Sequence, residues 1–385
     1  MKKLFLLLLL AFAALSVAAQ NFSIGSTSVN FIDPERNNRV INTNIYYPAE
    51  TAGQNVPLAS GEFPVIAFGH GFVMVHTAYE FLWLDLVPKG YILAFPTTEG
   101  SISPSHLNFG LDLAFIISKM KTENLDETSL FYEAVAETSA IMGHSMGGGA
   151  AFLACENNAE PTTMVTFAAA NTNPSSIQAA ANVNIPTLLF AGEFDCVTPP
   201  IQHQYPMYEA TASQQKIIID IFGGGHCYFA DYNFLCSLGE ASCIPQPLIN
   251  REQQQSVTLD FLSLYFDFML KNNAGSWQIF QDSLQSSLRI DYLMDWNTLS
   301  ASIQKDEPSF RIFPNPFRSN IIVEFPVGMP YDSIIVWNSL GQEMHKALLQ
   351  NGSQCEIDTR SWQKGAYVVM LVSKDGIARK KVFKR

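Results

Sequence analysis

The chain is poor in charge, and in positive charge above all. Among its 385 residues, 35 are aspartate or glutamate and 23 are lysine or arginine, which gives a net charge of −12. This balance argues against nucleic acid as the main partner. After the first twenty residues, no stretch offers the ~18 uncharged apolar residues that span a bilayer. The sequence also lacks a convergent set of metal ligands, so we expect neither a metal nor an organic cofactor.

The N-terminus has the pattern of an export signal. In "MKKLFLLLLLAFAALSVAAQ", two lysines precede an apolar run that ends in small residues. Such a segment predicts a signal peptide at residues 1–19, cleaved between Ala19 and Gln20. An uncleaved membrane anchor is the alternative. The mature protein would be soluble and either secreted or attached to the cell surface. We expect a monomer, although the sequence leaves the oligomeric state open.

Export bears on the six cysteines, because an oxidising compartment permits disulfides. The disulfide candidates are Cys196, Cys227, Cys236 and Cys243. Cys236 and Cys243 share the short loop "FLCSLGEASCIP", and we expect them to pair with each other. Cys155 lies on a predicted helix and is expected to be a buried free thiol. The sequence by itself does not fix the pairing.

Residues 20–299 predict an α/β domain. Short apolar runs predict strands at 63–71, 90–98, 138–145, 163–170, 185–195 and 215–224. Helix candidates lie at 77–88, 105–121, 146–157, 176–182, 200–213 and 252–271. Strands that are apolar on both faces and alternate with helices indicate a mostly parallel sheet covered on each side.

The pattern changes after a polar linker at 300–309. Residues 310–385 contain short strand candidates separated by turns, among them "IIVEFP", "SIIVWNS", "AYVVMLVS" and "KKVFKR". The charge reverses here, because residues 308–385 hold 11 lysines and arginines against 6 acidic residues. We predict a small all-β sandwich.

The stretch "AIMGHSMGGGA" (140–150) contains G-x-S-x-G between a predicted strand and a predicted helix. This context favours a sharp turn that exposes the hydroxyl of Ser145. Gly143 and Gly147 would leave room for the turn, and the N–H of Met146 would be free to bind an anion. We interpret Ser145 as a nucleophile.

A serine nucleophile needs a base and a group that orients the base. His226 lies in the glycine-rich "FGGGHCYF", directly after the last predicted strand, and is our candidate base. Asp195, just past the strand in "LLFAGEFDCVTPP", is the candidate acid, ahead of Glu193 and Asp220. The other histidines are placed less well: His70, His76, His106 and His144 precede the serine, His203 lies too near the acid, and His345 lies in the tail.

The second oxyanion donor should follow an early strand. The loop "AFGHGFVM" (67–74) supplies the N–H of Phe72, which we pair with that of Met146. Both residues would also present apolar side chains to a substrate.

Residues 22–270 resemble secreted α/β hydrolases of the cutinase-like, polyester-hydrolase and chlorophyllase group. The matching pieces are "NIYYPAE", "FPVIAFGHGF", "GYILAFPTT", "GHSMGGG", "PTLLFAGEFDCVTPP" and "GGGHCYF". The resemblance implies an α/β-hydrolase fold and a carboxylester hydrolase with Ser145, His226 and Asp195 as its triad. It also implies Phe72 and Met146 as oxyanion hole and substrate clamp, and a disulfide between Cys196 and Cys227.

One departure concerns the substrate. Polyester hydrolases of this group carry a tryptophan after the strand that follows the serine, whereas this chain has "FAAANTNPSS" (167–176) there. That weakens a specific expectation of aromatic polyesters. A serine carboxylesterase acting on short-to-medium esters is our expectation, with polyesters as a further substrate. The alternatives are a lipase, an amide-cleaving hydrolase, and a non-catalytic binding protein.

The tail resembles the C-terminal sorting domain of the type IX secretion system. The matching pieces are "FRIFPNPFRSNIIVEF", "VWNSLGQEM", "KGAYVVMLVS" and "KKVFKR". The resemblance implies recognition by an outer-membrane secretion machinery, followed by removal or surface attachment. The alternative is an accessory sandwich that binds carbohydrate or polymer, although Trp337 and Trp362 fit core positions as well.

Overall fold

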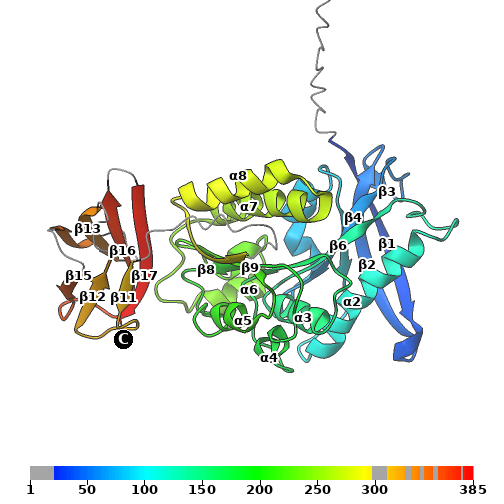
Figure 1. The fold of residues 1–385 in the computed structure, drawn as a ribbon. Helices are drawn as coiled ribbons and strands as arrows, with labels where there is room; N and C mark the ends of the chain where they lie inside the picture. The colour runs from blue at the N-terminus through cyan, green and yellow to red at the C-terminus, as the bar shows by residue number, and fades with distance from the viewer. Residues whose placement is uncertain are drawn as a thin grey trace, which may run out of the picture. The chain divides into compact units, whose positions relative to one another are not determined.

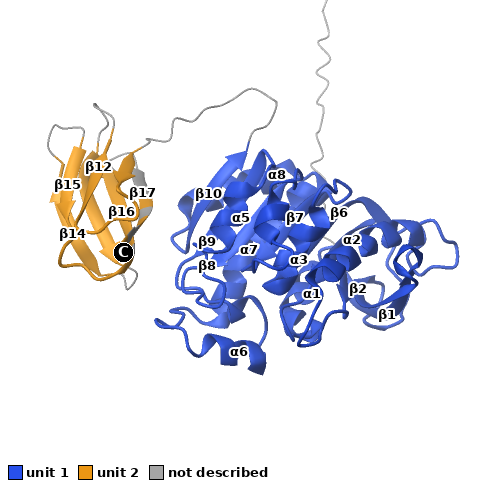
Figure 2. Cartoon of the chain, turned by 90° about the horizontal axis from the view of Figure 1, so that it is seen from below, with its two compact units in different colours: residues 1–298 blue, residues 299–385 orange. Residues whose placement is uncertain are grey.

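The chain forms two compact units, Met1–Thr298 and Leu299–Arg385, coloured separately in Figure 2. A computed structural model describes residues 21–296, 310–325, 331–338, 342–349, 354–373 and 376–384. The predicted signal peptide at 1–19 and the predicted linker at 300–309 lie outside these residues. Within the described part, no helix is both long and apolar enough to cross a membrane.

The first unit is built on a ten-stranded sheet with the order β10-β9-β8-β7-β6-β4-β5-β2-β1-β3. Six parallel strands form its centre: β4 (Phe63–Gly69), β5 (Ile92–Pro96), β6 (Val135–His144), β7 (Thr163–Phe167), β8 (Thr187–Gly192) and β9 (Gln215–Ile221). Each coincides with a strand predicted from its apolar run, so the mostly parallel α/β fold is confirmed.

The strands at the margins are those that the apolar runs did not predict. They are β1 (Ser23–Asp33), β2 (Arg39–Ala49), the two-residue β3 (Gly53–Gln54) and β10 (Ile290–Trp296). β2 and β10 pair antiparallel with β5 and β9. These strands have one face toward solvent, so polar residues interrupt them and no continuous apolar run marks them.

Helices cover both faces of this sheet, as Figure 1 shows. One face carries α2 (His106–Glu123), α3 (Met146–Cys155), α4 (Ser176–Ala180) and α5 (Gln204–Ala210). The other carries the 3₁₀ turn η2 (His76–Tyr79), α1 (Glu80–Leu86), α7 (Arg251–Lys271) and α8 (Ala274–Ser286). The short α6 (Phe234–Glu240) lies between β9 and α7 in the chain. The sequence analysis predicted neither α6 nor α8.

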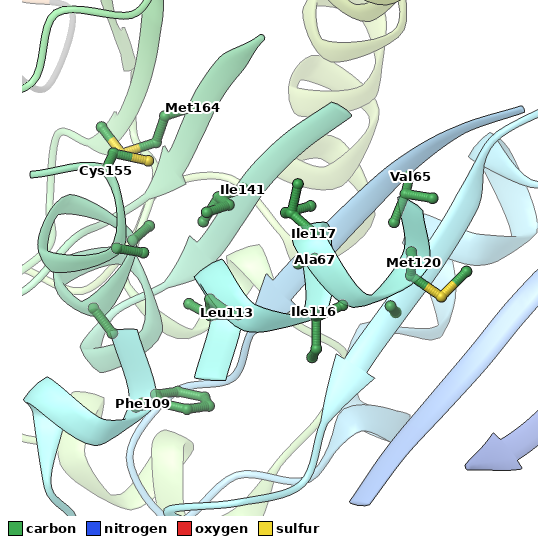
Figure 3. Packing of buried hydrophobic residues seen from close by; sticks show 14 of the residues in the cluster. Val65, Ala67, Phe109, Leu113, Ile116, Ile117, Met120, Ile141, Cys155 and Met164 are labelled. Carbon is green, nitrogen blue, oxygen red and sulfur yellow. The ribbon is translucent and has the colours of Figure 1, made fainter. Parts of the chain in front are cut away.

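Alternate side chains along each strand enter the two cores. Val65 and Ala67 of β4 join the core under α2 and α3, whereas Ile66 and Phe68 join the core under α7. Figure 3 shows the first core, where α2 directs Leu113, Ile116, Ile117 and Met120 at β4 and β6. Each large apolar side chain buried in this way stabilises the fold by roughly 1.5–3 kcal/mol. The parallel strands are thereby fixed, and with them the loops at their carboxyl ends.

The second unit contains two antiparallel sheets. One has the order β11-β12-β15 and the other β14-β13-β16-β17. Their strands are β11 (Arg311–Phe313), β12 (Asn320–Glu324), β13 (Tyr331–Asn338), β14 (Glu343–Leu348), β15 (Gln354–Asp358), β16 (Gly365–Ser373) and β17 (Gly376–Lys384). Both sheets contribute to one core, for example Val323 and Val369. Trp362 is buried in it and Trp337 is half-buried. The predicted all-β sandwich is confirmed.

Candidate active site

The serine turn, residues 143–149, joins β6 to α3. Ser145 has φ 55° and ψ −116°, a backbone conformation that a non-glycine residue adopts only when its surroundings enforce it. A Cβ on Gly143 would lie 2.3 Å from the carbonyl oxygen of Gly147, and one on Gly147 would lie 2.1 Å from that of Gly69. Neither approach is possible with a side chain. The turn therefore depends on both glycines, as the G-x-S-x-G spacing predicts.

Three main-chain hydrogen bonds hold Ser145 in this conformation. Its N–H donates to the carbonyl of Phe167 (2.9 Å), and its own carbonyl accepts from Ala170 (2.9 Å) and Gly149 (3.0 Å). The side chain is 8% exposed. The hydroxyl is thus fixed at the carboxyl edge of the sheet, where sites in open α/β sheets gather.

The structure brings the three residues Ser145, His226 and Asp195 together. Nε2 of His226 lies 2.9 Å from Oγ of Ser145, and Nδ1 lies 2.7 Å from Oδ2 of Asp195. A carboxylate only accepts, so Nδ1 carries a proton and the neutral ring turns the Nε2 lone pair toward the hydroxyl. The hydroxyl, imidazole and carboxylate form one hydrogen-bonded chain, buried from end to end.

Asp195 is held as a carboxylate by its own turn after β8. Oδ1 accepts the N–H groups of Val197 (2.8 Å) and Thr198 (2.7 Å), and Oδ2 accepts the Thr198 hydroxyl (2.8 Å). Burial alone would raise the pKa of Asp195, but the nearby His226 imidazole and the Thr198 hydrogen bonds outweigh it. Its pKa therefore lies below the usual value for aspartate.

His226 belongs to the histidine loop, residues 222–231, which follows β9. Gln254 of α7 binds both the N–H and the carbonyl of Gly225, each at 2.8 Å. Arg251 donates to the carbonyls of Cys227 and Ala230. The loop's main chain is thus tied to α7 on both sides of the imidazole.

A buried chain of hydrogen bonds connects this loop to the turn after β4. Nε2 of His144 lies 3.1 Å from the carbonyl oxygen of His226, and Nδ1 lies 3.0 Å from the Tyr79 hydroxyl. Burial and the neighbouring His226 hold the pKa of His144 well below its usual value, so the ring is neutral. Nε2 therefore donates to the carbonyl, and Nδ1 accepts from Tyr79. The tyrosine oxygen in turn accepts the N–H of Gly71 (2.8 Å).

The two expected oxyanion donors come from neighbouring segments. Phe72 follows β4 in the turn anchored by Tyr79, and Met146 is the first residue of α3. The close approach of Gly147 to Gly69 places these segments side by side. The Phe72 side chain is 48% exposed, whereas that of Met146 is buried in the core, which leaves little of it for a substrate to contact.

All four disulfide candidates form disulfides, but both expected pairings are wrong. Cys196 bonds to Cys243, and Cys227 bonds to Cys236. The sequence analysis expected Cys236 with Cys243, and the family resemblance implied Cys196 with Cys227. The segment after His226 folds back as α6, which brings residue 236 to 227 and residue 243 to 196. Cys155 is a buried free thiol, as predicted.

The competing acids and bases have other partners. Glu193 accepts the N–H of Gly223 (3.0 Å), and Asp220, inside β9, accepts the hydroxyl of Tyr205 (3.1 Å). His203 accepts the N–H of Asn171 through Nδ1 (2.9 Å). His106 bonds to Asn173, in the loop where the aromatic residue of polyester hydrolases is missing.

Several site residues were missed by the sequence analysis: Tyr79, Thr198, Glu240 and Gln254. Thr198 lies three residues after Asp195 in the quoted "DCVTPP". Its position could have identified it as a hydrogen-bond donor to the Asp195 carboxylate. The other three are brought to the site by tertiary folding, and no local pattern marks them.

Together the sheet, the serine turn and the hydrogen-bonded triad define an α/β-hydrolase fold with the geometry of a serine hydrolase. Comparison with known proteins agrees. Residues 13–242, more than half of the chain, match the PET hydrolase-like family, and the chain belongs to this family of ester hydrolases. Residues 311–385 match the secretion system C-terminal sorting domain. The chain is therefore an exported protein, secreted or held at the cell surface, as predicted.

The named relatives match smaller parts of the chain than the family does. Chlorophyllase-1 of Citrus sinensis is 32% identical over 100 residues, which cover 25% of this chain and 30% of the relative. Cutinase est2 of Thermobifida alba is 22% identical over 188 residues, covering 47% of this chain and 56% of the relative. The chain thus matches less than a third of the chlorophyllase and little more than half of the cutinase.

Proposed function

We propose that this protein is an exported serine carboxylester hydrolase that works through an acyl-enzyme. Ser145 is the nucleophile, His226 the general base and Asp195 the acid that orients it. The observation that carries the proposal is the hydrogen-bonded chain from Oγ of Ser145 through His226 to Asp195. Membership of an ester hydrolase family supports the reaction class.

The reaction follows from the positions of the protons. His226 takes the hydroxyl proton at Nε2 as Oγ attacks the ester carbonyl, and the imidazolium is stabilised by Asp195. The tetrahedral intermediate collapses as Nε2 returns the proton to the leaving alcohol. Water then enters, gives a proton to Nε2 and attacks the acyl carbonyl. The second tetrahedral intermediate breaks its bond to Oγ as Nε2 returns the proton to Oγ, which releases the acid and restores Ser145. No step in this scheme calls for a metal or organic cofactor.

The oxyanion is assigned to two main-chain donors, the N–H groups of Phe72 and Met146. Met146 begins α3, where the first N–H groups of a helix have no partner within the helix. Such donors act on charge that develops only in the transition state, and loss of one typically costs about a hundredfold in rate.

Short-to-medium esters are the proposed substrates, with polyesters as the second candidate. The PET hydrolase-like match and the cutinase relative favour a polymer. Three apolar residues next to proposed site residues are exposed: Phe72 itself at 48%, and Val197 and Ile201, which follow Asp195, at 40% and 58%. The missing aromatic residue in the loop after β7 favours aliphatic over aromatic polyesters.

The termini have proposed roles of their own. Residues 1–19 would direct export and be removed, and residues 310–385 would be recognised by the outer-membrane secretion machinery. We expect the hydrolase unit, residues 20–299, to hold the whole catalytic apparatus. Truncation after residue 299 should then abolish surface delivery and leave ester hydrolysis unchanged.

The test is an ester panel of increasing acyl length, with a polyester film, run on wild type and Ser145→Ala. The proposal expects turnover of soluble esters that falls by about four orders of magnitude or more in the variant. Film products would extend the assignment to polyesters. Faster cleavage of a matched anilide would favour an amide hydrolase, activation by an emulsion interface a lipase, and equal rates in both proteins a binding protein.

A further inference from the structure

Helix α6 has an inverted burial pattern. Its apolar side chains Phe234, Leu235 and Leu238 are 65%, 50% and 62% exposed. Glu240, the last residue of the helix, is 4% exposed and is the one residue of α6 that is buried. A carboxylate is rarely buried unless it is paired or bonded, so its surroundings define its role.

Glu240 binds the main chain at His226. Its Oε1 accepts the main-chain N–H of His226 at 2.5 Å and that of Cys227 at 3.2 Å. These are charge-assisted bonds, roughly twice as strong as neutral ones. They fix the main chain on both sides of the His226 Cα, and His144 binds the carbonyl of the same residue.

The histidine loop is shaped to admit this carboxylate. A Cβ on Gly225 would lie 2.4 Å from Oε1 of Glu240 and 2.4 Å from Cγ of Pro247. A residue with a side chain would therefore displace the carboxylate. Glycine at 225 thus provides the space that Glu240 occupies.

Both disulfides hold the segment that carries Glu240. Cys236, four residues before it, bonds to Cys227 beside the base, and Cys243, three residues after it, bonds to Cys196 beside the acid. A helix as short as α6 has little stability of its own. The two bonds therefore fix Glu240 relative to Asp195 and His226 together.

Other charged or titratable groups surround this pair. Asp195 and His226 face Glu240 from their loops, Arg251 from α7, and His144 and His203 lie near His226. Burial raises the pKa of Glu240, and Asp195 adds to the rise, whereas the main-chain donors and His226 oppose it. Glu240 and His226 attract each other when both are charged.

We propose that Glu240 is a positioning residue for His226: its carboxylate fixes the main chain of the base, and its charge stabilises the imidazolium formed during ester cleavage. The inference rests on the proposed function. It adds a second carboxylate, besides that of Asp195, to the groups that act on His226. The hydrogen bonds and the charge are separable, because glutamine retains an acceptor oxygen and aspartate retains the charge.

Kinetics against pH separate these two contributions. For Glu240→Gln we expect the acidic limb of the kcat/KM profile, measured with a soluble p-nitrophenyl ester, to move down by about one pH unit. For Glu240→Asp the limb should stay in place while kcat falls about tenfold, because the shorter side chain withdraws from the two N–H groups. Glu252→Gln, which removes an exposed charge one residue from Arg251, is the matched control and should follow the wild-type profile.

A second readout does not require turnover. Histidine-selective isotope labelling in a Ser145→Ala background gives the His226 titration directly by NMR, with and without Glu240→Gln. A lower midpoint in the double variant supports the inference even if no ester is cleaved, so its failure is distinct from that of the proposed function. Should the glutamine variant not fold, the aspartate variant carries the test.

Three outcomes would overturn the inference. The first is an acidic limb and an NMR midpoint in Glu240→Gln that superimpose on those of the parent protein. The second is an aspartate variant with wild-type kcat. The third is an equal loss of activity in both variants with no movement of the limb, which would reduce Glu240 to a purely structural support of the loop.

Discussion

The serine turn and the histidine loop meet at the 2.9 Å contact between Ser145 and His226, but they are held by different means. The turn is fixed by main-chain packing, with Gly147 against Gly69 and hydrogen bonds to the strand ends. The loop is fixed from outside, by the Cys227–Cys236 disulfide, Arg251, Gln254 and Glu240.

The serine turn is thus encoded by a short stretch of sequence, whereas the histidine loop depends on contacts with other parts of the fold. The serine turn depends on glycines, which have no side chain, so it tolerates almost no added atom at those positions. A loop held by several side-chain contacts should lose function in steps as each contact is removed. Perturbations of the turn are therefore expected to reduce activity more than perturbations of the loop.

The largest effect on activity is expected for Gly147→Ala. The new Cβ would lie 2.1 Å from a carbonyl oxygen that cannot move without β4, so we expect about 3 kcal/mol of destabilisation and at least a hundredfold loss in kcat/KM. Denaturant unfolding and ester kinetics measure both. Gly239→Ala in α6 is the control, since a Cβ there meets nothing within 4 Å. A Gly147→Ala enzyme with wild-type kinetics would contradict our account of the turn.

The same difference explains how far the sequence could be interpreted. The six parallel strands and the serine turn follow from local patterns: buried apolar runs, and glycines at fixed distances from Ser145. Asp195 and His226, the proposed triad members, could be predicted because each follows such a strand. The marginal strands β1 and β10 were missed because half of their side chains face solvent.

The disulfide pairing and the role of Glu240 lay beyond the sequence for a related reason. Proximity along the chain favoured Cys236 with Cys243, but α6 folds across the histidine loop and gives each cysteine a more distant partner. No pattern in the sequence marks Glu240, and only its burial in the folded protein distinguishes it from other acidic residues. Both depend on tertiary contacts that no local pattern in the sequence marks.

The two disulfides should contribute unequally to stability. They close loops with sequence separations of 47 and 9, so chain entropy predicts losses of about 4 and about 2.5 kcal/mol for Cys196→Ala/Cys243→Ala and Cys227→Ala/Cys236→Ala. Thermal and denaturant unfolding of the hydrolase unit give the values. Cys355→Ala, a free cysteine of the second unit, should leave that transition unchanged. The opposite ranking would refute the entropic argument.

Tyr79→Phe tests the buried chain that links the two loops. The variant leaves Nδ1 of His144 and the N–H of Gly71 without a partner, so we expect about a tenfold fall in kcat and a loss of about 1 kcal/mol in stability. Tyr265→Phe is the matched control: its hydroxyl is equally buried but bonds to Thr163, away from the site. Equal kcat values for the two variants would show that the chain has no part in catalysis.

A further effect, which leaves activity aside, is a dependence of stability on pH. The folded-state pKa of His144 lies well below its unfolded value of 6.5, so the unfolded chain binds a proton that the folded chain excludes. The free energy of unfolding should therefore be full above about pH 6.5 and fall by roughly 1.4 kcal/mol per pH unit below it. In His144→Gln that part of the slope should vanish. An unchanged slope would mean that another group titrates.

The central claim is that one hydroxyl is made nucleophilic by the imidazole beside it. An organophosphonate that traps activated serines tests it most directly, with the modified residue located by mass spectrometry of the peptides. We predict a single adduct on Ser145 in wild type, and at least a thousandfold slower labelling in His226→Ala. A wild-type protein that stays unlabelled, or one labelled equally fast without His226, would contradict the account.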